Sequence, residues 1–134
     1  MTRKCWRSLP RRAELLERAL RVARQDPPRL IAGDALDHLP AVLATCPDEQ
    51  ALCVFHTHTI NQFPPAARAR LAALLAEHAT TRDLYRVSIE WLGTDHPHLE
   101  LITFECGRQT IDLLARCGSH GEWLEWLARP CPPL

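Results

Sequence analysis

The residues best suited to chemistry form a short polar cluster between residues 56 and 61. His56, Thr57, His58 and Asn61 follow directly after an apolar run from Leu52 to Phe55. Imidazoles act as general acids or bases near neutral pH, and hydroxyl and amide groups can orient a substrate. The cluster is therefore the first candidate for a reacting or binding centre.

The two histidines offer a second chemistry, metal binding. His56 and His58 are two residues apart on a chain that we expect to remain extended, so their side chains would point to the same side. His120 or Glu90 could add a third ligand and leave one position open, as a catalytic zinc site requires. Ordinary hydrogen bonding to neighbouring loops is the commoner role of such histidines, and we favour it over metal.

Glu90 is the next informative residue because it lies in an otherwise apolar segment. A buried carboxylate must be paired or hydrogen-bonded, which makes Glu90 a candidate site residue. The alternation across residues 87–91 equally allows an outward-facing side chain on a strand. Nucleophilic catalysis is not expected, because Cys53 lies within the apolar run and neither Ser88 nor Ser119 stands in a glycine-flanked nucleophile motif.

The elements that would position these residues follow from periodicity and from turn signals. Apolar residues at helical spacing predict helices, and short alternating or apolar runs predict strands. Proline and glycine mark where these elements end. The predicted order begins with a helix at 11–25, a strand at 29–32, a helix from Asp34 to Cys46, a strand at 52–55 and a helix at 64–78. Three strands follow, at 84–92, 99–106 and 109–114, and the last element is a helix at 119–128.

The alternation of strand and helix up to residue 83 predicts parallel strands. Only Gly93 to His98 connects the next two strands, too few residues for a parallel crossover, so these must pair antiparallel. We predict an α/β fold with a three-layer, Rossmann-like arrangement around a mixed sheet. The leading strands of this sheet are parallel, the trailing strands form an antiparallel meander, and helices cover both faces. In such sheets ligands bind beyond the carboxyl ends of the strands, where the polar cluster falls.

Composition limits the class of protein. A chain of 134 residues with 46% hydrophobic content fits a single domain with one core. No apolar run is long enough to span a membrane, and residues 1–12 lack a signal-peptide pattern, so we expect a cytoplasmic protein without membrane contact. The six cysteines contain no CxxC pair and are expected to be free thiols.

Charge is unevenly distributed although the net charge is zero. Residues 1–29 hold nine basic and three acidic side chains. Such a segment can dock on an acidic partner or on nucleic acid, but a solvated helix face is the commoner explanation. Nucleic-acid binding is therefore not expected, and a protein partner stays open.

Five segments together resemble an uncharacterised bacterial family, a domain of unknown function. The resemblance covers nearly the whole chain, and because members of that family look longer, the chain resembles their carboxyl-terminal half. The segments are GDAL at 33–36, VFHT at 54–57, PPAARARLAALL at 64–75, SIEW at 88–91 and HGEWLEWL at 120–127.

The order of elements is also similar to the second half of the class I S-adenosylmethionine methyltransferase fold. The resemblance implies that Asp34, with its neighbour Ala35, contacts the adenine of the cofactor. It further implies that His56, Thr57 and His58 border the reacting centre, and we expect Asn61 at the same ligand edge. The chain departs from that fold in one respect, since no G-x-G turn occurs in it to cradle the cofactor.

Two functions from different classes are therefore expected. The first is a methyltransferase-like domain that has its ligand edge at the polar cluster and is completed by an amino-terminal half. The second is a non-catalytic module that packs against that half, or against another copy of itself, through the basic helix and an exposed sheet edge.

Overall fold

The computed structural model describes residues 9–105 and 107–127. The chain divides into two compact units, Met1–Ala32 and Gly33–Leu134. The first unit contains helix α1 (Leu9–Gln25), close to the helix predicted for residues 11–25. Its apolar stripe, which includes Leu16 and Leu20, is exposed within this unit. None of the described helices has the length and apolar character needed to cross a membrane.

The strand predicted at residues 29–32 is wrong. Residues 27–32 have no regular structure, and the side chain of Leu30 is 87% exposed. A short β-prone segment becomes a strand only when a neighbouring strand supplies hydrogen-bond partners, and residues 9–32 of this unit contain no strand.

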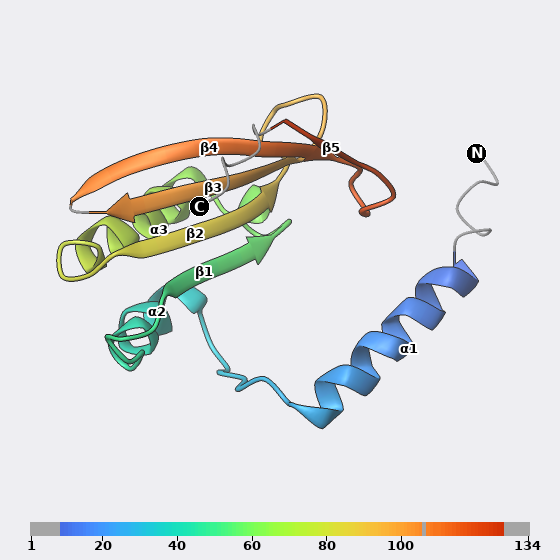
Figure 1. The fold of residues 1–134 in the computed structure, drawn as a ribbon, viewed down its shortest axis with the longest axis horizontal. Coiled ribbons are helices and arrows are strands. Elements are labelled where there is room, and N and C mark those ends of the chain that lie inside the picture. The colour runs from blue at the N-terminus through green and yellow to red at the C-terminus, as the bar shows by residue number, and fades with distance from the viewer. Residues whose placement is uncertain (1–8, 106, 128–134) are drawn as a thin grey trace, which may run out of the picture. The chain divides into compact units, whose positions relative to one another are not determined.

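The second unit is built on a five-stranded sheet in the order β1-β2-β3-β4-β5 (Figure 1). The first pair is parallel and the other three pairs are antiparallel. The parallel strand predicted before the polar cluster and the antiparallel meander are both present, but the sheet as a whole is mostly antiparallel. The predicted burial of that strand is wrong in part, because β1 is the first strand in the sheet order and Cys53 and Phe55 are exposed. The strands are β1 (Leu52–Thr57), β2 (Leu84–Glu90), β3 (His98–Glu105), β4 (Arg108–Cys117) and β5 (Leu124–Trp126).

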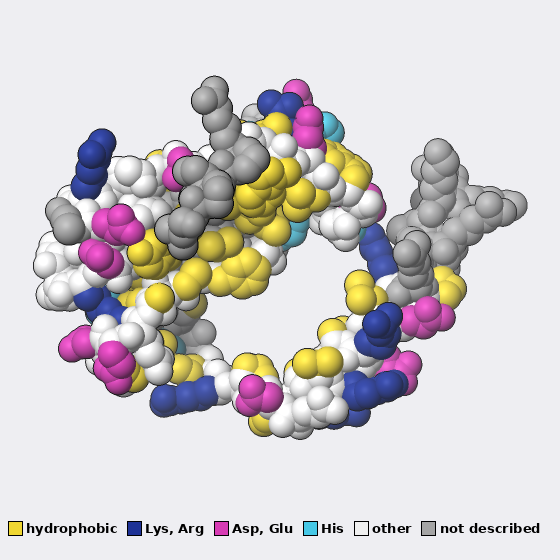
Figure 2. Space-filling view, viewed as in Figure 1, with side chains coloured by type: hydrophobic (Ala, Val, Ile, Leu, Met, Phe, Trp, Pro, Cys, Tyr) yellow, Lys and Arg dark blue, Asp and Glu magenta, His cyan; other side chains and the backbone are white. Residues whose placement is uncertain are grey.

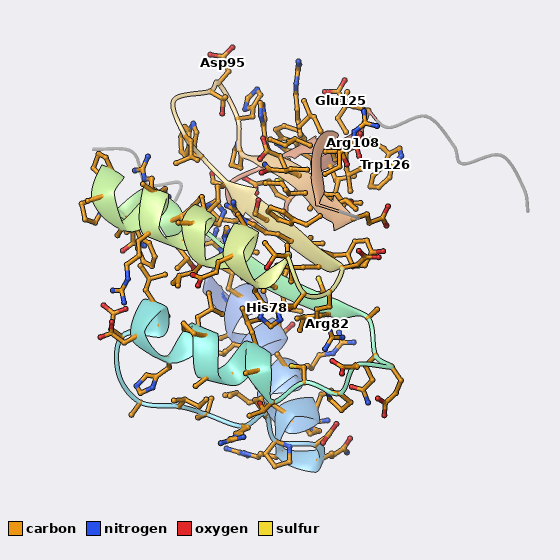
Figure 3. The ribbon with its side chains drawn as sticks, turned by 90° about the vertical axis from the view of Figure 1, so that its left-hand side faces the viewer. His78, Arg82, Asp95, Arg108, Glu125 and Trp126 are labelled. Carbon is orange, nitrogen blue, oxygen red and sulfur yellow. The ribbon has the colours of Figure 1, made fainter. Side chains whose placement is uncertain are left out.

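Helices α2 (Ala35–Ala44) and α3 (Pro65–His78) match two predicted helices and lie on the same face of this sheet (Figures 1 and 3). The prediction of helices on both faces does not describe this unit, in which the sheet and its helices form two layers. In a doubly wound sheet each crossover helix joins parallel strands, and here only β1 and β2 are joined in that way, through α3.

The core lies between the helices and one face of the sheet. The buried side chains on this face come from alternate positions of the strands, as the two-residue period of a strand requires. On the opposite face, Phe55 is 65% exposed, and Figure 2 shows hydrophobic side chains gathered there. The core cluster is Leu36, Leu43, Leu52, Ile60, Leu71, Leu75, Ala79, Leu84, Ile102 and Phe104.

The helix predicted at residues 119–128 is also wrong as far as residue 127. Residues 124–126 form β5, in which Trp126 lies opposite Ala115 of β4. The turn before it is closed by the backbone N–H of Gly118, which donates to the carbonyl of Trp123. Gly121 has a φ of +70°, outside helical geometry, so a glycine turn competes successfully with the apparent capping box. Ala128 lies outside the described residues.

Arg82 fixes the end of the sheet that lies away from the polar cluster. Its guanidinium donates to the carbonyl oxygens of Cys46 and Gln50, in the segment that leads into β1. Figure 3 shows this side chain in the connection between α3 and β2. The two parallel strands are thereby held together at their amino ends as well as by their ladder.

Candidate functional site

Glu90 ends β2 with its carboxylate buried, only 5% exposed, beneath the turn that follows β1. Its Oε1 accepts hydrogen bonds from the backbone N–H groups of Thr59 at 2.9 Å and Ile60 at 3.2 Å. Its Oε2 accepts from the N–H of Asn61 at 3.2 Å. Residues 60–62 form a short 3-10 helix, η2 (Ile60–Gln62), so the carboxylate satisfies the free N–H groups at its start.

His56 joins this carboxylate to a half-buried arginine, Arg86. Its Nδ1 lies 2.7 Å from Glu90 Oε1, and its Nε2 accepts a hydrogen bond from Arg86 Nε at 2.9 Å. Because a guanidinium can only donate, Nε2 must carry the lone pair and Nδ1 the proton. His56 is therefore a neutral bridge that donates to the carboxylate.

Burial and hydrogen bonding shift the pKa values of all three groups. Burial lowers the pKa of His56 from its ordinary value of 6.5, and the charge of Arg86 adds to this against the opposing effect of Glu90. Burial alone would raise the pKa of Glu90, but the three backbone N–H groups and His56 outweigh it and lower that pKa. Burial also lowers the pKa of Arg86. The arrangement thus favours an ionised Glu90 beside an uncharged His56.

A cavity of about 340 Å³ opens beside this network, between the start of α2 and the carboxyl end of β1. Most of its wall is apolar, and His56 is the one titratable side chain that lines it. A cavity with an apolar wall and few polar groups is typical of a small-molecule site. Its lining residues are Ala35, Leu36, Leu39, Val54, Phe55, His56, Thr59, Ile60, Phe63 and Leu71.

Asp34 and Ala35, the predicted cofactor residues, lie at this cavity's edge in different roles. Ala35 lines the cavity. Asp34 is the N-cap of α2, and its Oδ1 accepts a hydrogen bond of 2.7 Å from the N–H of Leu36. The helix-capping role considered for Asp34 is confirmed, and its side chain is exposed beside the lining residues.

The remaining predicted residues are only partly brought together. Thr57 is exposed, and its carbonyl accepts from Thr59 Oγ1. The carbonyl of His58 accepts from Gln62 Nε2. Asn61 contributes its backbone N–H to Glu90, while its side-chain Oδ1 is buried with no hydrogen-bond partner among the described residues. The structure therefore gathers His56, Glu90 and the Asn61 backbone and leaves Thr57 and His58 outside the network.

The premise for a shared metal at the two histidines fails. β1 ends at Thr57, and His58 has a φ of +48°, so the chain is no longer extended there. Both ring nitrogens of His56 are already hydrogen-bonded. Across residues 9–105 and 107–127, no three histidine, cysteine or acidic side chains gather as metal ligands would.

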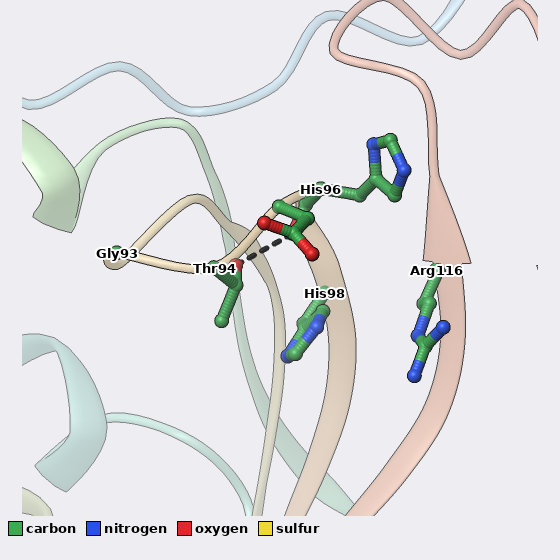
Figure 4. Close-up of a pocket in the computed structure, with 6 residues that line it drawn as sticks. Gly93, Thr94, His96, His98 and Arg116 are labelled. Atoms are coloured by element: carbon green, nitrogen blue, oxygen red, sulfur yellow. Dashed lines mark hydrogen bonds between the residues drawn. The ribbon is translucent and has the colours of Figure 1, made fainter.

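A second cavity, of about 410 Å³, lies at the connection between β2 and β3 (Figure 4). It is polar and exposed, and Thr94 Oγ1 donates across it to the carbonyl of His96. None of the residues predicted for the site lines it. The lining residues are Gly93, Thr94, Asp95, His96, His98 and Arg116.

Sequence reasoning missed Arg86 as part of the network. A signal was available, because Arg86, Ser88 and Glu90 are spaced by two and share one face of β2. A charged residue that shares a face with a buried carboxylate is a candidate partner for it or for its neighbours. The apolar lining residues carried no such signal, since their pattern is that of ordinary core.

The comparisons with known proteins agree with the sequence resemblance at the level of the family. No curated protein and no solved structure matched the chain. One family model matched residues 5–126, described as an uncharacterized protein conserved in bacteria (DUF2332). Since the match spans most of the chain, the protein belongs to this family of uncharacterised bacterial proteins.

Proposed function

We propose that this domain binds a small ligand with a flat, largely apolar part in the cavity at the carboxyl end of β1. The observation that supports the proposal is the position of that cavity. It borders the hydrogen-bonded side chains of His56 and Glu90, at the carboxyl end of β1 and β2, which are the only parallel strands that pair among the described residues. The carboxyl ends of parallel strands are where α/β sheets bind ligands.

The residues around the cavity would contribute to ligand recognition in different ways. The apolar side chains of Leu36, Leu39 and Phe63 suit a ring that would otherwise be hydrated. His56 adds its ring surface to the wall, and the position of that ring is fixed by hydrogen bonds at both nitrogens. A fixed ring against which a flat ligand can pack costs little entropy on binding.

A nucleoside is the ligand class we favour, with S-adenosylmethionine or its demethylated product as the finer proposal. An adenine ring suits the apolar wall, and the exposed Asp34 carboxylate beside Ala35 could accept hydrogen bonds from a ribose. The amino-acid part of such a cofactor finds no counterpart, because the sequence has no G-x-G turn. We therefore propose nucleoside binding, with the remainder of a methyltransferase-like site supplied by another segment, and derive no methyl-transfer step.

Calorimetric titration of adenosine, S-adenosylmethionine and its demethylated product tests this proposal. The expected result is saturable binding of at least one of them. The variant Ala35→Leu should weaken binding by about tenfold or more, because added carbons would fill the cavity at its edge. Ala41→Leu on the exposed side of the same helix is the matched control and should leave the affinity unchanged.

Two results would contradict the proposal. If none of the three compounds binds, nucleoside recognition is wrong. If one binds equally well to Ala35→Leu and to the unchanged chain, the ligand occupies a different place. Circular dichroism of both variants shows whether α2 is still formed, so that a loss of binding is not confused with a loss of structure.

A non-catalytic interaction module is the second candidate function. It is favoured by the outer edge of β1, which no strand of residues 33–127 covers. The two functions are compatible, because the edge and the cavity use different atoms of the same strand.

A further inference from the structure

The outer edge of β1 lacks the features that keep edge strands from pairing. Among the described residues, the strand pairs with β2 alone, on one side. Its sequence, LCVFHT, contains no lysine, arginine, carboxylate or proline, and its ladder with β2 has no bulge. Natural edge strands are usually protected by such residues, by a bulge or by being very short. At the other edge of the sheet, β5 has only three residues.

The backbone groups that face this edge can be identified from the ladder. The N–H of His58 donates to the carbonyl of Ile89, at the β2 side, at 2.8 Å. Successive residues of a parallel strand alternate the side to which their N–H and C=O groups point. The N–H groups of Cys53, Phe55 and Thr57 therefore face the open edge, and none has a hydrogen-bond partner among the described residues.

We propose that a second copy of the chain occupies this edge, with the two β1 strands paired antiparallel around a two-fold axis at Phe55. A two-fold axis perpendicular to the sheet requires an antiparallel pair. In this register Phe55 lies opposite Phe55 of the second copy, and Cys53 lies opposite Thr57. Every outward-facing residue then meets an outward-facing residue, so the free N–H and C=O groups can form a regular ladder.

Side chains support a second copy as the occupant. The exposed Phe55 rings would meet at the axis, and neighbouring aromatic residues on one sheet face stabilise a strand pair. A closed pair leaves no β1 edge free, so association ends at the dimer.

The pairing of the two β1 strands would also affect the proposed ligand cavity. This effect on ligand binding rests on the proposed function. Val54, Phe55 and His56 line that cavity. The β1 strand of the second copy would lie about 5 Å away along the same edge, which places it against the outer side of the cavity. The association itself is tested without ligand, so its failure is distinguishable from a failure of nucleoside binding.

Disulfide trapping tests the register. Directly opposed residues of a hydrogen-bonded antiparallel pair have Cα atoms about 5.5 Å apart, within the range of a disulfide. The variant Thr57→Cys should therefore cross-link under mild oxidation to Cys53 of a second copy. Within one strand these two positions are about 13 Å apart, so the bond cannot form inside one chain. Mass spectrometry identifies the linked peptides, and Thr57→Cys combined with Cys53→Ser is the control.

Sedimentation equilibrium of the full chain tests the association. The unchanged chain should contain a dimer whose fraction rises with concentration. Phe55→Lys should shift it to monomer, because it sets two like charges opposite each other at an exposed position. Thr110→Lys, at an exposed position on β4, is the matched control and should stay dimeric.

Three results would overturn the proposal. The first is a monomer at every soluble concentration. The second is a dimer that Phe55→Lys leaves unchanged while the 53–57 cross-link fails to form. The third is a monomer in which Ile31→Cys cross-links to Cys53 of its own chain. This result would show that the edge of β1 is covered by residues of the same chain.

Discussion

Glu90 combines a structural and a chemical role in one carboxylate. It accepts hydrogen bonds from three backbone N–H groups of the turn after β1 and from His56 Nδ1–H. A buried charge is tolerated only when hydrogen bonds compensate it. Glu90 meets that condition, so both the shape of the turn and the tautomer of His56 depend on it.

Replacing Glu90 with glutamine should destabilise the domain by about 2–3 kcal/mol, the usual worth of a hydrogen bond to a buried charged group. The amide keeps the size of the side chain but turns an N–H group toward donors that need an acceptor. The free energy of unfolding in urea measures the effect. Glu49→Gln is the control, since its exposed carboxylate should matter by less than about 0.5 kcal/mol. Equal stability of the two variants would contradict the proposed role.

Stability should fall on acidification in two steps. The pKa of His56 is lowered in the folded chain, so below pH 6.5 the unfolded chain binds a proton that the folded chain does not. The free energy of unfolding should therefore decrease from pH 6.5 down to the folded pKa of His56. The pKa of Glu90 is lowered too, which adds a further decrease below its ordinary value of 4.5.

Urea unfolding between pH 5 and pH 8 measures the first step. His56→Gln should remove it, because the variant has no imidazole to protonate at that position. His38→Gln is a control at an exposed histidine and should retain the step. A pH profile that is the same with and without His56 would show that another group is responsible.

Single residues of the site were predictable from sequence, but their pairing was not. His56 and Glu90 each stood out as polar residues at the end of, or within, an apolar run. They are 34 positions apart, and only the parallel register that sets His56 beside Ser88 brings the carboxylate within reach. Register of this kind depends on the packing of α3, which periodicity does not specify.

At the scale of elements, the N-terminus of α2 shows how one residue can serve a helix and border a cavity. Asp34 caps α2 through the N–H of Leu36, and the next residue lines the cavity. Capping does not require the carboxylate charge, whereas a hydrogen bond from a ligand hydroxyl is stronger with it. An amide can cap, but it lacks the charge that would hold a ribose most strongly.

Asp34→Asn and Asp34→Ala should separate these two roles. The asparagine variant should keep the cap and therefore the stability, whereas alanine should cost about 1 kcal/mol. If Asp34 also contacts a nucleoside, asparagine should weaken binding with little change in unfolding. Parallel urea unfolding and calorimetric titration supply both readouts. A large loss of stability in Asp34→Asn would contradict simple capping.

The predicted elements were correct where the local pattern was strong and wrong where long-range partners decided. The patterns for α1, α2 and the first three strands were clear, and the proline pair at 64–65 marked the start of α3. The pattern for β4 was weaker, and the strand extends beyond the predicted residues 109–114 to Cys117. Residues 29–32 have β-prone side chains, but no strand forms within residues 9–32 to pair with them. Residues 124–126 have helical spacing of tryptophans, yet they pair with β4. In both cases the outcome depended on a neighbour that local sequence does not specify.

For the molecule as a whole, the core belongs entirely to the second unit. Every residue of the core cluster, from Leu36 to Phe104, follows residue 33. The parallel pair, the meander and both packed helices are also within that unit. The site and the sheet that positions it therefore lie in one unit, and the apolar stripe of α1 is exposed within the other.

A chain that begins at Gly33 should therefore fold without residues 1–32. We expect a cooperative urea transition and native-like circular dichroism, because no buried core side chain is removed. The full chain measured in the same way is the control. A shortened chain that lacks a cooperative transition would show that the first unit contributes to folding.

The hydrogen bonds from the turn after β1 to the Glu90 carboxylate should be detectable by NMR spectroscopy of the backbone amides. Amide protons directed at a charged oxygen resonate downfield and exchange slowly with deuterated solvent. Thr59, Ile60 and Asn61 should therefore resist exchange although they belong to a short connection. The slow exchange of all three amides should be lost together, in a single step, when Glu90 is protonated.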